Sequence, residues 1–310
     1  MTQRIFSASD FQDPPARGRR SGGGSVVGRI VSGLVGLIVT APALLLVMAG
    51  GARSYSETLQ RASLEPAAAA ILLLSAGLVL VLIVTLSGLF SALGPFVAGA
   101  IATGLGVAFL VSPTLVGTVS GALPALGVSP LTLLVFWCQS GLLLATGIVL
   151  LGSSLARLIA ARTKRVRKGS GARALVSILV GVVVTPFGIG LVAVGSSGLL
   201  EAFSRASGSA PAEPRSLIIV TAGAVVLAGV ALTTAWSSIG AAIAGVLVVV
   251  FGLLAVFPAA VLWIHRTASA LNMQIAEGLS SAVAVGFVAV LGLVLLGAAA
   301  SSARARRAGR

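Results

Sequence analysis

The chain has 310 residues, of which 57% are apolar and 9% are charged. A soluble domain carries charge on about a quarter of its residues, so this chain has too few polar side chains to cover a water-soluble globule. The same high hydrophobicity excludes intrinsic disorder. The formal net charge is +14, and the single cysteine, Cys138, can form neither an intrachain disulfide nor a thiolate metal cluster. Composition therefore indicates an integral membrane protein.

Residues 1–25 are polar, with a proline pair and a glycine run, and are predicted to form a flexible tail. Arg19 and Arg20 precede the first apolar run, as in a twin-arginine signal. No convincing cleavage site follows, and the first apolar run has a counterpart later in the chain that cannot be a signal. We therefore interpret these arginines as topology-setting charges.

Eight apolar segments follow the tail, each near or above the roughly 20 residues that a helix needs to cross the hydrocarbon core. Their length, and the absence of alternating apolar and polar positions, exclude transmembrane strands. The predicted spans are residues 30–51, 67–91, 95–117, 131–156, 174–198, 217–238, 240–263 and 279–302. The predicted fold class is thus an all-α integral membrane protein with eight transmembrane helices.

The basic residues are unevenly distributed between the two predicted sides of the membrane. Sixteen lie before the first span, between the fourth and fifth spans, or after the eighth, and only two acidic residues accompany them. The other side has five basic and five acidic residues. Because cytoplasmic loops carry the excess of Lys and Arg, both termini and the 157–173 loop are predicted to be cytoplasmic. An odd number of spans would break this partition.

The basic loop at 157–173 is expected to meet anionic lipid headgroups on the cytoplasmic side. Nucleic-acid binding is not predicted, because no aromatic stacking residues are interleaved with the charges. Arginine outnumbers lysine 19 to 2 in a sequence rich in alanine, glycine and valine. This bias suits a GC-rich bacterial genome, so the expected location is a bacterial plasma membrane.

The two halves of the sequence repeat one another. GLVGLIVTAP at Gly33–Pro42 matches ILVGVVVTP at Ile178–Pro186, and GIVLLG at Gly147–Gly152 matches GLVLLG at Gly292–Gly297. The offset stays at 144–146 through four spans. This pattern predicts a tandem 4+4 parallel duplication, with a pseudo-twofold axis along the membrane normal. The predicted units are a tail at 1–25, repeats at 26–160 and 174–302, a linker at 161–173 and a basic tail at 303–310.

The first helix of each repeat contains a proline, Pro42 or Pro186, close behind a threonine, Thr40 or Thr185. Proline removes a backbone donor and kinks a helix, and in lipid the freed carbonyl needs another partner. Paired interruptions at matching places in two halves indicate a transport site. The alternative interpretation is a structural kink that was copied by duplication.

Polar and aromatic residues within the spans are few. Gln139 is the strongest polar group in a span, and either bonds across helices or contacts a solute. The lone histidine, His265, cannot build a metal site by itself. Trp137, Trp236 and Trp263 fall near predicted helix ends, as in an aromatic belt.

The segment after the first helix of each repeat is also duplicated, as YSETLQRAS at 55–63 and LLEAFSRAS at 199–207. Each is predicted to form a short helix with one apolar stripe at the outer interface. Each carries a Glu–Arg pair in the favourable order, Glu57 with Arg61 and Glu201 with Arg205. The segments are either ordinary interfacial turns or a docking surface for a partner outside the membrane.

No motif for metal-dependent, serine or phosphate-loop catalysis stands in the sequence, so no enzyme activity, cofactor or metal is predicted. Two hypotheses remain. The first is a packing or scaffold component of an envelope complex, with a membrane or envelope protein as partner. The second is a facilitated permease for a small neutral or apolar solute, with a path between the repeats near the paired prolines. A closed, dry interface between the repeats would favour the first hypothesis, and a cavity lined by Thr40, Thr185 and Gln139 the second.

Overall fold

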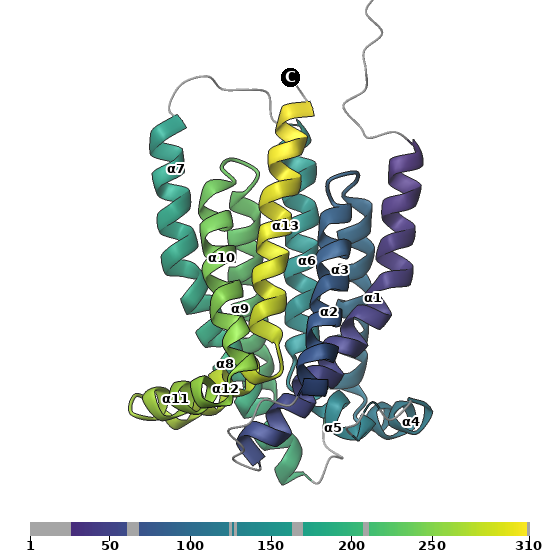
Figure 1. Cartoon of the computed structure of the whole chain (residues 1–310), viewed down its shortest axis with the longest axis vertical. Helices are drawn as coiled ribbons and strands as arrows, with labels where there is room; N and C mark the ends of the chain where they lie inside the picture. Colours follow the sequence, from purple (N-terminus) through teal and green to yellow (C-terminus); the bar gives the residue numbers. More distant parts are fainter. Residues whose placement is uncertain are drawn as a thin grey trace, which may run out of the picture.

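A computed structural model of the chain describes residues 26–60, 68–123, 126, 129–162, 170–206 and 211–308. These residues form helices joined by short connections, and no strand occurs among them (Figure 1). Eight of the described helical segments are long and apolar enough to cross a membrane. The chain is therefore a multi-pass helical membrane protein.

Ten helical elements make up most of the membrane-spanning segments. They are α1 (Val26–Tyr55), α2 (Ala68–Ser87), α3 (Leu93–Val111), α6 (Leu142–Arg162), α7 (Ser170–Leu179), the π-helix η4 (Val180–Val184), α8 (Thr185–Arg205), α9 (Pro214–Thr233), α10 (Ile239–Leu253) and α13 (Phe287–Ala308). α7, η4 and α8 run on as one continuous segment. α1 begins and α13 ends at the same end of the bundle, here called the termini end (Figure 1).

Short helical elements occur at the opposite end of the bundle, here called the platform end (Figure 1). They are η2 (Ser56–Gln60), α4 (Thr114–Ala122), α5 (Pro130–Leu134), the π-helix η3 (Val135–Gln139), the 3₁₀-helix η5 (Leu254–Val256), α11 (Pro258–Ser269) and α12 (Met273–Ala284). α4 and α11 extend sideways from the bundle in opposite directions.

The third and seventh spans are shorter than predicted. They end at Val111 and Val256, whereas the expected spans ran to 117 and 263. Pro113 follows the first of these ends as the N-cap residue of α4, and Pro258 follows the second as the first residue of α11. Proline cannot continue the preceding helix but fits the first turn of a new one, so the chain changes direction there.

The fourth and eighth spans begin later than predicted, at Leu142 and Phe287 rather than at 131 and 279. Gly141 and Gly286 stand immediately before them, with φ of +76° and +81°. Glycine adopts this left-handed backbone at little cost, so the chain turns sharply at both positions. The preceding apolar residues form separate short helices instead of continuing the span.

The last spans of the two halves lie together at the centre of the bundle (Figure 1). α6 and α13 pack against each other, α6 also packs against α9, and α13 against α2. Within each half, α1 packs on α2 and α3 on α6, as α8 packs on α9 and α10 on α13. The first half (residues 26–162) and the second half (residues 170–308) are therefore joined through α6 and α13.

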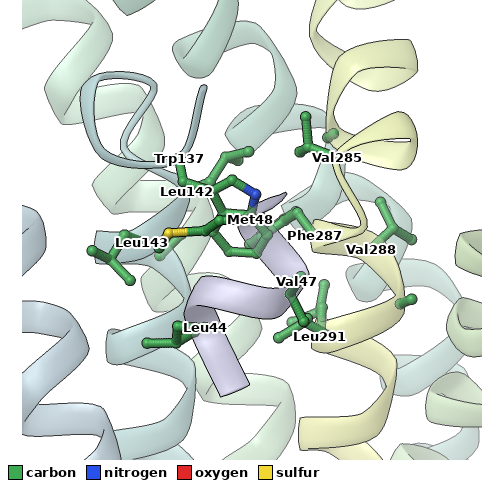
Figure 2. Close-up of a cluster of buried hydrophobic side chains, with 14 of the residues drawn as sticks. Leu44, Val47, Met48, Trp137, Leu142, Leu143, Val285, Phe287, Val288 and Leu291 are labelled. Carbon is green, nitrogen blue, oxygen red and sulfur yellow. The ribbon is translucent and has the colours of Figure 1, made fainter. Parts of the chain in front are cut away.

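A dense apolar core fills the space between the halves near the platform end. Figure 2 shows Trp137 beside Met48 of α1 and Phe287 of α13. The rings of Trp137 and Phe287 are edge to face, with their centroids 6.3 Å apart. Trp137 is completely buried, so the prediction that it belongs to an aromatic belt is wrong. The reason is that its short helix turns into the bundle before Gly141, whereas Trp236 and Trp263 are exposed.

Candidate functional site

The paired prolines stand in different local backbones. Pro42 lies inside α1, which continues as an α-helix on both sides. Pro186 lies in the first turn of α8, directly after the π-helix η4. A π-helix pairs each donor with a carbonyl five residues earlier, so the second helix changes its hydrogen-bond pattern just before the proline. The two interruptions match in sequence but differ in hydrogen bonding.

The threonines beside the prolines also differ. Both side chains are buried, with 3% of Thr40 and 1% of Thr185 exposed. The Thr40 hydroxyl donates to the carbonyl of Gly36, not to a carbonyl that Pro42 leaves free. The Thr185 hydroxyl has no hydrogen-bond partner among the described residues. The two hydroxyls therefore do not share one role.

A small cavity lies beside Thr40, between α1, α2, α3, α6 and α13. Its volume is about 20 Å³, and Thr85 and Thr146 line it together with apolar side chains. A space of this size holds roughly one water molecule. Thr185 and Gln139 do not line it, and the Gln139 amide instead donates to the carbonyl of Phe109 at 2.9 Å. The structure does not bring Thr40, Thr185 and Gln139 together around one cavity.

A much larger hollow, here called the platform hollow, opens at the platform end and has a volume of about 690 Å³. The first half contributes Tyr55 and Phe136, whose ring centroids lie 4.2 Å apart. The second half contributes Glu201, His265 and Glu277, among other side chains. The hollow thus spans the junction between the halves and combines aromatic surface with two carboxylates.

The histidine of the platform hollow is held by a neighbouring helix. His265 of α11 lies with Nδ1 3.2 Å from the Ser280 hydroxyl of α12. Met273, at the start of α12, adds an exposed apolar side chain to the rim. No sequence motif predicts this group, because the packing of α11 on α12 brings His265 and Glu277 to the same hollow.

A second hollow of about 360 Å³ shares Glu201 and is lined mainly by polar groups. The predicted ion pair is present there, with Arg205 Nη2 3.6 Å from a Glu201 carboxylate oxygen. Glu213 caps α9 by accepting the Ser216 backbone N–H at 2.7 Å. Hydrogen bonding from Ser216 lowers the pKa of the Glu213 carboxyl below its usual value. Charged groups of both signs therefore surround the α8 end.

The two duplicated segments differ from the short interfacial helices that were expected. α8 runs unbroken through Arg205, so the segment around Glu201 extends a membrane-crossing helix. In the first half, α1 passes into the π-helix η2, and Glu57 pairs with Arg53 at 3.3 Å. Arg61, the predicted partner of Glu57, lies outside the described residues.

Among the described residues, no group of three or more His, Cys, Asp or Glu side chains is placed to hold a metal ion. The candidate site is a surface hollow with carboxylates, one imidazole and aromatic walls. No protein-family model, curated protein or solved structure matches this chain.

Proposed function

We propose that this protein is a non-catalytic packing or scaffold component of an envelope complex in a bacterial plasma membrane. The observation that supports this proposal most is the contrast between interior and surface. The cavity beside the first proline measures about 20 Å³, whereas the platform hollow measures about 690 Å³. Space for a partner is at the end of the bundle, while the junction between the halves is filled by large side chains.

We further propose that the bundle is a tandem 4+4 duplication. Close helix contacts recur at matching positions in the two halves, each at a glycine whose missing side chain lets another backbone approach. The matching pairs are Gly36 on Gly94 with Gly181 on Gly240, Gly77 on Val47 with Gly223 on Val192, and Gly147 on Thr103 with Gly292 on Val249. The left-handed glycines Gly141 and Gly286 form a fourth matching pair.

In this proposal the termini end faces the cytoplasm and the anionic headgroups there, and the platform end faces outward. The support is the charge distribution, because described basic side chains at the termini end include Arg29, Arg157 and Arg304. At the platform end, Glu201 and Glu213 accompany Arg205 and Arg215. An excess of arginine marks the cytoplasmic side.

The partner in this proposal is a membrane or envelope protein that presents a basic and aromatic segment to the platform hollow. Tyr55 and Phe136 supply an aromatic wall, and Glu201 and Glu277 supply negative charge. Aromatic anchors inside a polar rim are the usual composition of a protein interface. The duplicated segment around Glu201 and Arg205 then forms part of the docking surface.

The alternative is a facilitated permease for a small neutral or apolar solute. One observation favours it, namely that Thr40, Thr85 and Thr146 line a cavity beside the proline of α1. Passage of any solute larger than water would require the helices around this cavity to separate. This second function therefore depends on a more open conformation.

Two measurements on the intact protein distinguish the proposals. In the first, purified protein in liposomes is tested for the flux of glycerol and urea by light scattering. Scaffolding predicts the same rates as in protein-free liposomes, and a clear increase that Thr40→Val alters would support the permease instead.

In the second measurement, tagged protein is purified from host membranes in mild detergent, with a Glu201→Gln/Glu277→Gln variant in parallel. Scaffolding at the platform hollow predicts a stoichiometric partner that the double variant loses. Glu213→Gln, which removes a carboxylate outside that hollow, should keep the partner. Recovery of the wild type alone, at unchanged yield, would argue against the proposal.

A further inference from the structure

A pocket at the termini end gathers three arginines from three different helices. Arg29 of α1, Arg157 of α6 and Arg304 of α13 line a space of about 660 Å³. The turn between α2 and α3 closes one side, and no Asp or Glu is among the described residues that line the pocket. In the part of the chain that the structure describes, three guanidinium groups therefore surround one space without a carboxylate among its walls.

The arginines of this pocket, here called the arginine pocket, have unused hydrogen-bonding capacity. Nη2 of Arg157 lies 3.5 Å from the carbonyl of Leu89, at the limit of a hydrogen bond, and its Nε is buried without a partner among the described residues. The guanidinium carbon of Arg304 lies 5.3 Å from the centre of the Phe90 ring. This cation–π contact uses the face of the Phe90 ring and takes up none of the guanidinium N–H groups in a conventional hydrogen bond.

The electrostatics of the pocket favour an anion. Arg304 acts on Arg157 as a nearby like charge, and such repulsion is relieved when a negative group lies between them. A phosphate is the best match, because its oxygens accept paired N–H bonds from guanidinium forks. The pocket also lies at a depth suitable for a phosphate at the membrane surface, since Arg157 and Arg304 are within the last two turns of α6 and α13.

The walls of the pocket are apolar and open to the surroundings of the bundle. Leu93, Phe96 and Leu158 line it, and each is more than 40% exposed. A free inorganic phosphate has no apolar surface to bury against such walls, whereas the acyl chains of a phospholipid would pack along them. The combination of arginines at the helix ends and apolar side chains beside them therefore fits a lipid.

We propose that the arginine pocket is a specific binding site for the phosphate headgroup of an anionic phospholipid, with the acyl chains along Leu93, Phe96 and Leu158. Because the lipid would contact α1, α6 and α13, it would tie the first half to the last helix of the second. This site does not depend on whether the platform hollow binds a partner.

A second pocket at the same end provides an internal comparison. It has a volume of about 620 Å³ and is lined by Arg173, Val176, Trp236 and other residues of α7 and of the connection after α9. Its size and apolar walls resemble those of the arginine pocket, but Arg173 is the one arginine among the described residues that line it. The proposal therefore predicts specific lipid binding at the first pocket and not at the second.

The test is a lipid titration of the full chain in detergent, followed by native mass spectrometry and thermal unfolding. The probes are dioleoyl phosphatidylglycerol, dioleoyl phosphatidylcholine and inorganic phosphate. The proteins are the wild type, Arg157→Gln/Arg304→Gln, and the control Arg173→Gln/Arg307→Gln, which removes the same charge elsewhere at this end. Phosphatidylglycerol should bind the wild type and the control equally and the first variant about tenfold more weakly, because hydrogen bonds to charged groups are strong.

Several results would overturn the proposal. Equal phosphatidylglycerol binding by all three proteins would show that net charge alone attracts the lipid. Equal binding of phosphatidylcholine would remove the requirement for an anionic headgroup. Binding or stabilisation by inorganic phosphate as strong as that by phosphatidylglycerol would show a free-anion site instead of a lipid site.

Arg157 is half-buried, so the double variant also changes packing, and Arg29→Gln serves as a second variant. Arg29 is exposed in the first turns of α1, and its loss should leave the fold intact. The proposal predicts that Arg29→Gln weakens phosphatidylglycerol binding while stability in lipid-free detergent stays the same. Lower lipid-free stability with unchanged lipid affinity would indicate a structural role for the arginines and contradict the site.

Discussion

Gly141 and Gly286 adopt nearly the same left-handed backbone, with φ of +76° and +81°, and each separates a short helical element from a long crossing helix. Each also faces the other half, because an added Cβ would meet Leu199 and Val220 at Gly141, and Leu74 and Val47 at Gly286. The sharp turn and the contact between halves thus occur at the same residue. Both functions restrict these positions to glycine.

The first prediction concerns these turns. Replacing Gly141 or Gly286 with alanine should lower stability in detergent by about 1–2 kcal/mol for the left-handed backbone alone. Gly286→Ala should be the more damaging, because its Cβ would come within 2.5 Å of Leu74, against 3.1 Å at the closest contact of Gly141. Thermal unfolding monitored by circular dichroism measures the stability of both variants.

Gly190→Ala in α8 is the matched control, since an added Cβ there meets nothing within 4 Å. Alanine favours a helix over glycine by about 1 kcal/mol, so this variant should be as stable as the wild type or more so. Equal effects of all three substitutions would mean that the left-handed turns are not required for the fold.

The second prediction concerns topology. Ser269→Cys at the end of α11 should react with a membrane-impermeant maleimide in intact cells, because Ser269 is exposed at the platform end. Ala308→Cys at the end of α13 should react only after the cells are permeabilised. The unaltered protein should stay unlabelled, because Cys138 is 1% exposed. Labelling of Ala308→Cys alone in intact cells would reverse the proposed orientation.

The third prediction separates the two threonines beside the prolines. Thr40→Val removes the hydrogen bond to Gly36 and should destabilise the protein by about 1 kcal/mol. Thr185→Val replaces a buried hydroxyl that has no partner among the described residues, so it should be neutral or stabilising. Valine has nearly the shape of threonine, which makes each substitution a test of the hydroxyl.

Changes of opposite sign in the thermal stability of the two variants would support this difference between the two helices. A similar loss in both variants would indicate that Thr185 also donates a structural hydrogen bond. A solute that stabilises the wild type but not Thr40→Val would point to the permease instead.

The eight crossing helices could be predicted from the sequence because length and hydropathy alone determine whether a segment can span a bilayer. The late starts of α6 and α13 could not, because Gly141 and Gly286 are two of 39 glycines and nothing marks their backbone as left-handed. Burial of Trp137 was missed for the same reason, since it depends on where the preceding helix turns.

The candidate sites show a similar division. The Glu201–Arg205 pair could be predicted from the sequence, because residues four apart lie on the same face of a helix. The arginine pocket depends on three helix ends meeting, and residues 29, 157 and 304 are far apart in the sequence. Positive charge predicted a side of the membrane, but the packing of α1, α6 and α13 determined which charges became neighbours.

The central place of α13 has a consequence for biosynthesis. α6 and α13 are the most buried of the crossing helices, and α13 is the last of them to leave the ribosome. Until it inserts, one face of α6 and one face of α2 have only lipid as a neighbour. Assembly of the first half is therefore completed only after α13 has inserted, and a chain cut before Phe287 would leave the small-residue surfaces of α6 without this helix as a neighbour.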